Sequence, residues 1–128
     1  DERLDSEIMS REDRAQSLAQ VTRTRSGWDA LPGQFNPPPR THRRVVVDFN
    51  GGPLQFLPPR AMVSAEAQVS SGEISNLSVQ VLPDGGRRAT FTLVAEEDRG
   101  ADMRGYLRLE NQAVSETWSY LWESPSAP

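Results

Sequence analysis

The sequence predicts an all-β fold, an antiparallel sandwich of six to seven strands that follows an N-terminal arm. From residue 43 onward, short segments that alternate apolar and polar residues are separated by glycine and proline turns. No helical crossover interrupts them, so neighbouring strands are expected to pair antiparallel. Residues 102–123 then form two long alternating segments around a short polar turn, which is typical of a hairpin.

The hairpin at residues 102–123 is expected to be the aromatic wall of the core. A two-residue loop at 111–112 would pair Leu109 with Val114 and place Gly105 opposite Trp118. The missing side chain of the glycine would leave room for the indole ring. Glu116 shares the inner face by alternation, where a carboxylate is costly unless it is paired, or unless a bulge turns it outward.

The remaining strands are expected at residues 44–49, 62–70, 74–82 and 88–94, with a short extra strand at 54–57. The segment Asp84-Gly85-Gly86 is the clearest hairpin turn in the chain. Alternation predicts that the apolar side chains Leu77, Val79 and Val81 face inward, as do Ala89, Phe91 and Leu93. The predicted core is built around Phe49, Phe91, Leu107 and Trp118.

Three regions are predicted along the chain: an arm and linker over residues 1–42, the sandwich over 43–123 and a disordered tail over 124–128. Ser10 followed by Asp13 would cap a short helix running to about residue 21. A short strand at 21–25 and a proline-rich spacer with Pro37-Pro38-Pro39 would follow. Leu18, Trp28 and Leu31 are the candidate docking residues of this arm. A chain that starts at Asp1 is expected to be a processed protein or a piece of a longer one.

Composition narrows the chemistry available to the chain. The 128 residues contain no cysteine and a single histidine, His42, so neither a zinc site nor a thiol nucleophile is expected, and no cofactor is predicted. A net charge of −4 argues against general nucleic-acid binding. No segment has the apolar length of a membrane span. No motif of nucleophilic catalysis accompanies His42, and no catalytic residue is predicted.

The outward face of the hairpin is the candidate binding surface. Its residues are Arg104, Tyr106, Arg108, Thr117 and Ser119. Flat sheet faces of this composition bind glycans or protein surfaces through ring stacking and forked hydrogen bonds. An ordinary solvated face has the same composition, and both interpretations stay open.

Four strings together indicate a family. They are VTRTRSG at 21–27, VVVDFNGG at 45–52, GEIS at 72–75 and SETWSY at 115–120. In this order and spacing the chain resembles the C-terminal domain of the periplasmic glucan biosynthesis proteins of the MdoG/OpgG and OpgD family. The resemblance implies an immunoglobulin-like sandwich and a periplasmic location in a Gram-negative bacterium. It also implies that the acidic catalytic residues of those members that are β-1,2-glucanases lie in a large glucan-cleft domain outside this sequence.

Two functions are therefore expected. The first is a non-catalytic module that acts in glucan synthesis by binding or scaffolding, with the large domain, a periplasmic or membrane protein complex, or glucan itself as partner. The alternative is a free-standing structural subunit that docks on a periplasmic or membrane assembly through its arm and linker. Neither involves an enzyme activity of this polypeptide.

Overall fold

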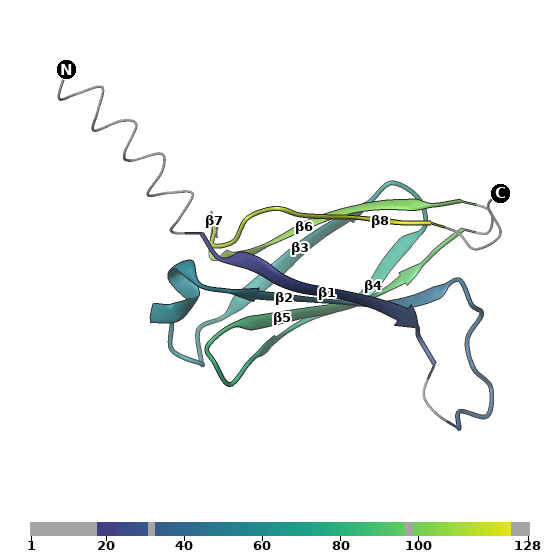
Figure 1. The fold of residues 1–128 in the computed structure, drawn as a ribbon, viewed down its shortest axis with the longest axis horizontal. Coiled ribbons are helices and arrows are strands. Elements are labelled where there is room, and N and C mark those ends of the chain that lie inside the picture. The colour runs from purple at the N-terminus through teal and green to yellow at the C-terminus, as the bar shows by residue number, and fades with distance from the viewer. Residues whose placement is uncertain (1–17, 31–32, 97–98, 124–128) are drawn as a thin grey trace, which may run out of the picture.

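A computed structural model describes residues 18–30, 33–96 and 99–123, and it shows two antiparallel sheets packed face to face (Figure 1). The first sheet has the order β1-β2-β5-β4, and in the second β6 lies between β3 on one side and β7 and β8 on the other. The strands are β1 (Gln20–Trp28), β2 (His42–Asn50), β3 (Val63–Val69), β4 (Glu73–Val81), β5 (Arg87–Val94), β6 (Ala101–Leu109), β7 (Gln112–Ala113) and β8 (Trp118–Trp122). The predicted all-β antiparallel sandwich is confirmed.

The core lies between the inner faces of the central strands. In β2 and β5 the alternating apolar residues meet across the sheet, with Val45 opposite Phe91 and Val47 opposite Ala89. From the facing sheet, the indole of Trp118 meets the ring of Phe91 edge-on, with 5.9 Å between ring centroids. The four residues Phe49, Phe91, Leu107 and Trp118 are each at most 4% exposed. Alternation along each strand therefore produces the apolar interior.

The first strand begins earlier and runs further than the sequence predicts. A short strand at 21–25 was expected ahead of a sandwich that starts at residue 43, whereas β1 pairs with β2 from Gln20↔Asn50 to Trp28↔Arg43. Without β1, the edge of β2 that faces away from β5 would stay unpaired, and the polar residues of β1 suit an edge strand. Residues 20–28 therefore belong to the sandwich.

The proline-rich segment is the connection from β1 to β2, at the end of the molecule opposite the short helix η1 (Gly52–Phe56) (Figure 1). The indole Nε1 of Trp28 donates to the carbonyl oxygens of Pro38 at 3.0 Å and Pro39 at 3.2 Å. The guanidinium of Arg40 lies over the same ring, 3.9 Å from its centroid. Trp28, expected to be a docking residue, thus holds its own chain's proline loop in place.

Little of the predicted arm falls within the described residues. Leu18 is half-buried, and the chain is already extended from Ala19, which forms a bridge with Ser115. The last residues of the expected helix are therefore not helical. The rest of that helix, Leu31 and the tail at 124–128 lie outside the residues that the structure describes.

The C-terminal hairpin contains an irregularity that alternation did not predict. Gly105 does lie opposite Trp118, but Leu109 pairs with Gln112 rather than with Val114. The register therefore shifts by two residues between β7 and β8, which breaks the expected continuous strand. Glu116 falls in this break and is exposed, so its carboxylate avoids the cost of burial.

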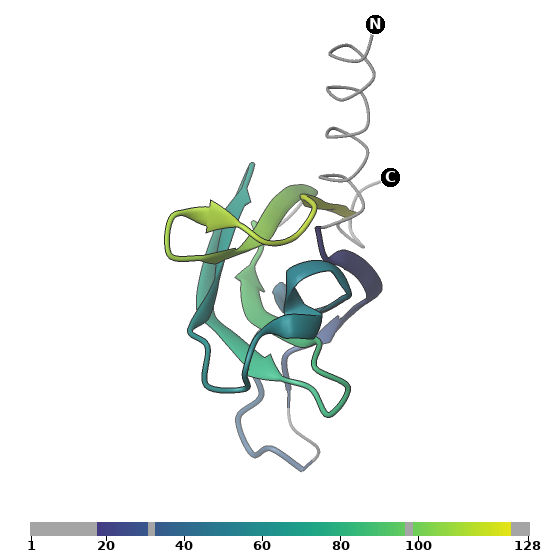
Figure 2. The same ribbon diagram turned by 90° about the vertical axis from the view of Figure 1, so that its left-hand side faces the viewer.

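Two further segments differ from expectation. The predicted strand at 54–57 is instead the 3-10 helix η1, which buries Leu54 (Figure 2). It follows Gly51 at φ 85° and has Pro53 in its first turn. In β4 a bulge between Ser75 and Ser78 leaves Leu77 38% exposed and, further along, Val81 39% exposed. These β4 side chains lie at the mouth of the sandwich rather than in its core.

Candidate binding face

The outer face of the second sheet contains the candidate residues of β6. Arg104, Tyr106 and Arg108 alternate with the fully buried Met103 and Leu107, so they point away from the core. Arg104 is exposed, while Tyr106 and Arg108 are half-buried. The outward direction of these three side chains follows from sequence alternation alone.

Strand β3 adds polar side chains that the sequence interpretation missed. In the register of the two strands Ser64 lies opposite Arg108, Glu66 opposite Tyr106 and Gln68 opposite Arg104. The alternation of β3 was visible in the sequence, with its small apolar residues on one face. No sequence pattern indicated which strand β3 would pair with. Its polar face could therefore not be placed beside that of β6.

One end of this face is held together by charge. The guanidinium of Arg108 forms an ion pair with Glu66, with 3.0 Å between Nη2 and Oε1, and its Nε donates to the hydroxyl of Ser64 at 3.3 Å. Both charged side chains are more than 40% exposed, so solvent screens their attraction. The pair orients the Glu66 carboxylate as a hydrogen-bond acceptor at the edge of the face.

Arg104 lies between two shallow depressions on the same face. One has a volume of about 210 Å³ and is lined by Glu66, Gln68, Tyr106 and Thr117 together with Arg104. The other, of about 270 Å³, is lined by Gln68, Val69, Ser70 and Asp102 together with Arg104. Among the described residues Arg104 forms no ion pair and no hydrogen bond through its side chain. Its guanidinium donors are therefore available to a ligand.

The structure brings three of the five candidate residues to one depression, namely Arg104, Tyr106 and Thr117. Ser119 lies opposite Arg104 in the register of β6 and β8 and is exposed, but it lines neither depression. Arg108 is engaged by Glu66 as described. Gly105 forms part of the floor, and a Cβ there would lie 2.7 Å from the carbonyl oxygen of Glu66. The glycine is thus required by the close approach of β3, rather than by the indole as expected.

Two of the four strings that indicated a family, at 21–27 and 115–120, meet on the side where β1 meets β8. Trp118 Nε1 donates to the hydroxyl of Thr24 at 3.0 Å, and the hydroxyls of Ser26 and Tyr120 are 3.3 Å apart. The segments at 21–27 and 115–120 therefore bind each other across the sandwich. Their role in this structure is to join its two sheets.

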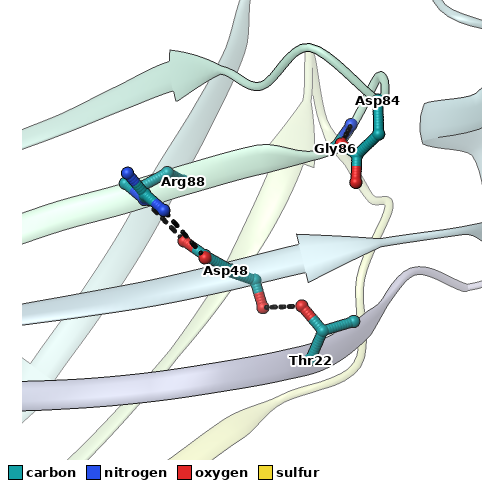
Figure 3. A network of polar contacts seen from close by, with 5 residues as sticks. All are labelled: Thr22, Asp48, Asp84, Gly86 and Arg88. Atoms are coloured by element: carbon teal, nitrogen blue, oxygen red, sulfur yellow. Dashed lines mark hydrogen bonds and ion pairs between the residues drawn. The ribbon is translucent and has the colours of Figure 1, made fainter.

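An ion pair that includes Asp48 of the string at 45–52 lies on the outer face of the first sheet. Asp48 and Arg88 lie opposite each other on β2 and β5, and both carboxylate oxygens accept from the guanidinium, at 2.7 Å and 3.0 Å (Figure 3). The hydrogen bonds from Arg88 hold the pKa of Asp48 below its usual value, against the opposing effect of burial. The hydroxyl of Thr22 donates to the backbone carbonyl of Asp48 at 3.2 Å, which attaches β1 to the same pair.

Neither metal chemistry nor a membrane helix is indicated by the described part of the chain. It contains no group of three or more histidine, cysteine, aspartate or glutamate side chains placed to hold a metal ion. No helix within it is long and apolar enough to cross a membrane.

These features define a small β-sandwich module with a shallow polar face and a guanidinium left free for a ligand. The family model described as "Periplasmic glucan biosynthesis protein, MdoG" matches residues 5–122, and the chain belongs to this family. The resemblance inferred from the sequence motifs is confirmed.

Similar proteins include several called glucans biosynthesis protein D. The one from Pseudomonas syringae pv. tomato is 38% identical over 117 residues, which are 85% of this chain and 22% of that protein. Glucans biosynthesis protein D 2 of Ralstonia nicotianae is 38% identical over 87% of this chain and 21% of its own length. The protein from Xanthomonas axonopodis pv. citri is 38% identical over 84% of this chain. The chain thus spans about a fifth of the length of these relatives.

Proposed function

We propose that this chain is a non-catalytic module of a periplasmic glucan biosynthesis factor, and that it binds glucan on the outer face of β3 and β6. The observation that carries the proposal is the free guanidinium of Arg104 between two depressions lined by amide, hydroxyl, carboxylate and phenol groups. Sugar hydroxyls need such mixed donors and acceptors. The family membership supports glucan as the ligand class and the periplasm as the location.

The chemistry of the face suits holding a chain rather than cleaving it. Arg104 donates forked hydrogen bonds, Gln68 donates and accepts, and the half-buried ring of Tyr106 offers an apolar surface to a sugar ring. The Glu66 carboxylate is held by Arg108, and its oxygens can accept hydrogen bonds from sugar hydroxyls. Shallow depressions leave most of a bound sugar in water, so the affinity is expected to be weak, about 1 mM in Kd.

The alternative role, a subunit that docks through its arm and linker, has less support. The Trp28 indole already binds the carbonyls of Pro38 and Pro39 and carries Arg40 on its ring. Trp28 and the proline segment therefore already bind each other within this chain. Residues of the arm before Leu18 lie outside the described part of the structure.

The test is an NMR titration of the ¹⁵N-labelled chain with glucan oligosaccharides of different linkage. Binding should shift the amides of Gln68, Arg104 and Tyr106, and Arg104→Ala should weaken it at least tenfold. Arg25→Ala is the matched control, because Arg25 is an exposed arginine on a strand of the other sheet. Absence of shifts up to the solubility limit of every oligosaccharide, or equal loss in both variants, would refute glucan binding at this face.

A further inference from the structure

The sandwich has two long sides, and hydrogen bonds within the described residues join the two sheets along one of them. Where β1 meets β8, the Ala19 amide donates to the Val114 carbonyl at 2.9 Å and the Glu116 amide donates to the Ala19 carbonyl at 2.8 Å. The hydroxyl and indole contacts of Thr24 and Ser26 described above lie along the same side. This side has backbone and side-chain hydrogen bonds from one sheet to the other.

The opposite side, between β3 and β4, is not closed by backbone pairing, although a short turn at 70–72 joins the two strands and they lie close together. Each of these strands is the last in its sheet, and within the described residues neither pairs with a second neighbour. A groove of about 520 Å³ lies at one end of this side, where the start of β3 faces the second half of β4. Its lining includes Val63, Ala65, Leu77, Val79, Val81 and the side chain of Arg87.

Apolar side chains are exposed along this groove. Leu77 is 38% and Val81 39% exposed on β4, and Met62, just before β3, is 85% exposed. Leu77 lies within the bulge of β4 and lines this groove, and it also borders the interior beside Phe91 and Trp118. Exposed apolar residues beside two strands with unpaired backbone groups form a surface onto which a further extended chain can add.

Polar residues also line this groove, among them the exposed Arg60 and a buried arginine, Arg87, which has no negative partner among the described residues. Arg87 is 1% exposed, and its guanidinium donates only to backbone carbonyls, to Gly85 at 2.7 Å, to Gly86 at 3.4 Å and to Pro58 at 3.3 Å. Its Nε is buried and makes no hydrogen bond. Within the described residues no carboxylate forms an ion pair with it.

The nearest acidic residue in the sequence is already used. Asp84, in the turn before β5, accepts from the Gly86 amide at 2.9 Å and from the Asn50 amide group at 2.8 Å. Carbonyl dipoles satisfy part of the Arg87 donor set but do not neutralise its charge. A buried cation in this state is strongly stabilised by a carboxylate that reaches it without water.

We propose that the groove between β3 and β4 binds an extended segment of a partner protein that presents one carboxylate among apolar residues. The backbone of the segment pairs with the free edge of β3 or β4, and its apolar side chains cover Leu77 and Val81. Its carboxylate forms the ion pair that Arg87 lacks. Charge complementarity favours an acidic segment, and the unpaired strand edges favour a peptide rather than a small anion. The proposal does not depend on glucan binding, because the two surfaces are built from different residues.

The probes for a test are blocked peptides of alternating valine and threonine with a single aspartate, placed at successive positions in different members of the set. A matched set has asparagine in place of aspartate. In NMR titrations at least one aspartate peptide should shift the amides of Val63 and Val79 and the Nε–H signal of Arg87. Its asparagine counterpart should bind at least tenfold more weakly.

Leu77→Asp should abolish binding of the aspartate peptide, because it places a repelling carboxylate in the groove. Leu121→Asp is the matched control: Leu121 is 59% exposed and lies on β8, away from β3 in the same sheet. Arg87→Gln should lower the affinity for the aspartate peptide to that for the asparagine peptide. If that variant does not fold, Leu77→Asp and the peptide pair still decide the question.

Four outcomes would overturn the proposal. They are no binding by any peptide at its solubility limit, equal affinity of the aspartate and asparagine sets, shifts that map outside the groove, and equal losses in Leu77→Asp and Leu121→Asp. Sedimentation of the chain alone provides a further check. A dimer that Leu77→Asp dissociates would assign the groove to a second copy and would also contradict a separate acidic partner.

Discussion

Replacing Trp118 with alanine should remove the side chain that contributes most to the packing of one sheet on the other. The side chain is 4% exposed. Its ring is packed edge-on against Phe91 and parallel to Tyr120, at 5.9 Å between centroids in both cases. Its Nε1 also donates to Thr24 on β1. The variant therefore loses contacts with both sheets at once.

The expected loss is about 3–5 kcal/mol in the free energy of unfolding, which is the cost of truncating a buried tryptophan to alanine. This value already contains the hydrogen bond to Thr24, whose own contribution is about 0.5–1.5 kcal/mol. With a denaturant dependence of about 2 kcal/mol per molar urea, the unfolding midpoint should fall by about 2 M. Domains of this class are stable by about 5–15 kcal/mol, so the variant should lie near the limit of folding.

The assay is urea unfolding followed by far-ultraviolet circular dichroism, which does not depend on the fluorescence of the replaced residue. Leu121→Ala on the same strand is the control, and it should change stability by no more than about 0.5 kcal/mol. A double-mutant cycle of Thr24→Val and Trp118→Phe should give a coupling of about 1 kcal/mol. A loss below about 1 kcal/mol for Trp118→Ala would show that the indole does not hold the sheets together.

Gly105→Ala should destabilise the fold by about 1–3 kcal/mol in the same unfolding assay, because its Cβ would lie 2.7 Å from a carbonyl oxygen of β3; a neutral result would contradict the close approach of the strands. Ser115→Ala should cost about 1–3 kcal/mol and speed amide exchange at Leu107, because the buried Leu107 N–H donates to the serine hydroxyl at 2.8 Å; unchanged exchange would refute this role. Arg88 lowers the pKa of Asp48, so the pair stabilises the fold above the unfolded-state pKa near 3.8 and its contribution is lost as pH falls through the lower folded-state pKa. Asp48→Asn should therefore be less stable than the wild type at neutral pH, with the gap closing in acid; a gap of the same size at about pH 2 would contradict the pairing.

Much of the core could be predicted from the alternation of apolar and polar residues within single strands. Phe49, Phe91, Leu107 and Trp118 were identified by alternation, and all four are buried. The same alternation turned Arg104 outward. Side-chain direction along a strand depends only on the parity of positions, so neighbouring residues are enough to predict it.

Only part of the candidate face could be predicted from the sequence. The β6 residues Arg104 and Tyr106 were found, whereas Glu66 and Gln68 became part of the face through the pairing of β3 with β6. These segments are about forty residues apart in the sequence. Which strands pair is decided by the packing of the two sheets, and no residue pattern within β3 records it.

The sequence by itself determined the sandwich class, the inner and outer face of the regular strands, and the family, because these depend on local periodicity and on motif strings. Only the tertiary structure decided that β1 belongs to the sheet, that Trp28 binds the proline loop, and that the hairpin register shifts before β8. It also left Arg87 buried beside an open groove. Each of these depends on hydrogen bonds and contacts between distant segments, whose free energies are set when the sheets close on each other rather than by the residues on either side.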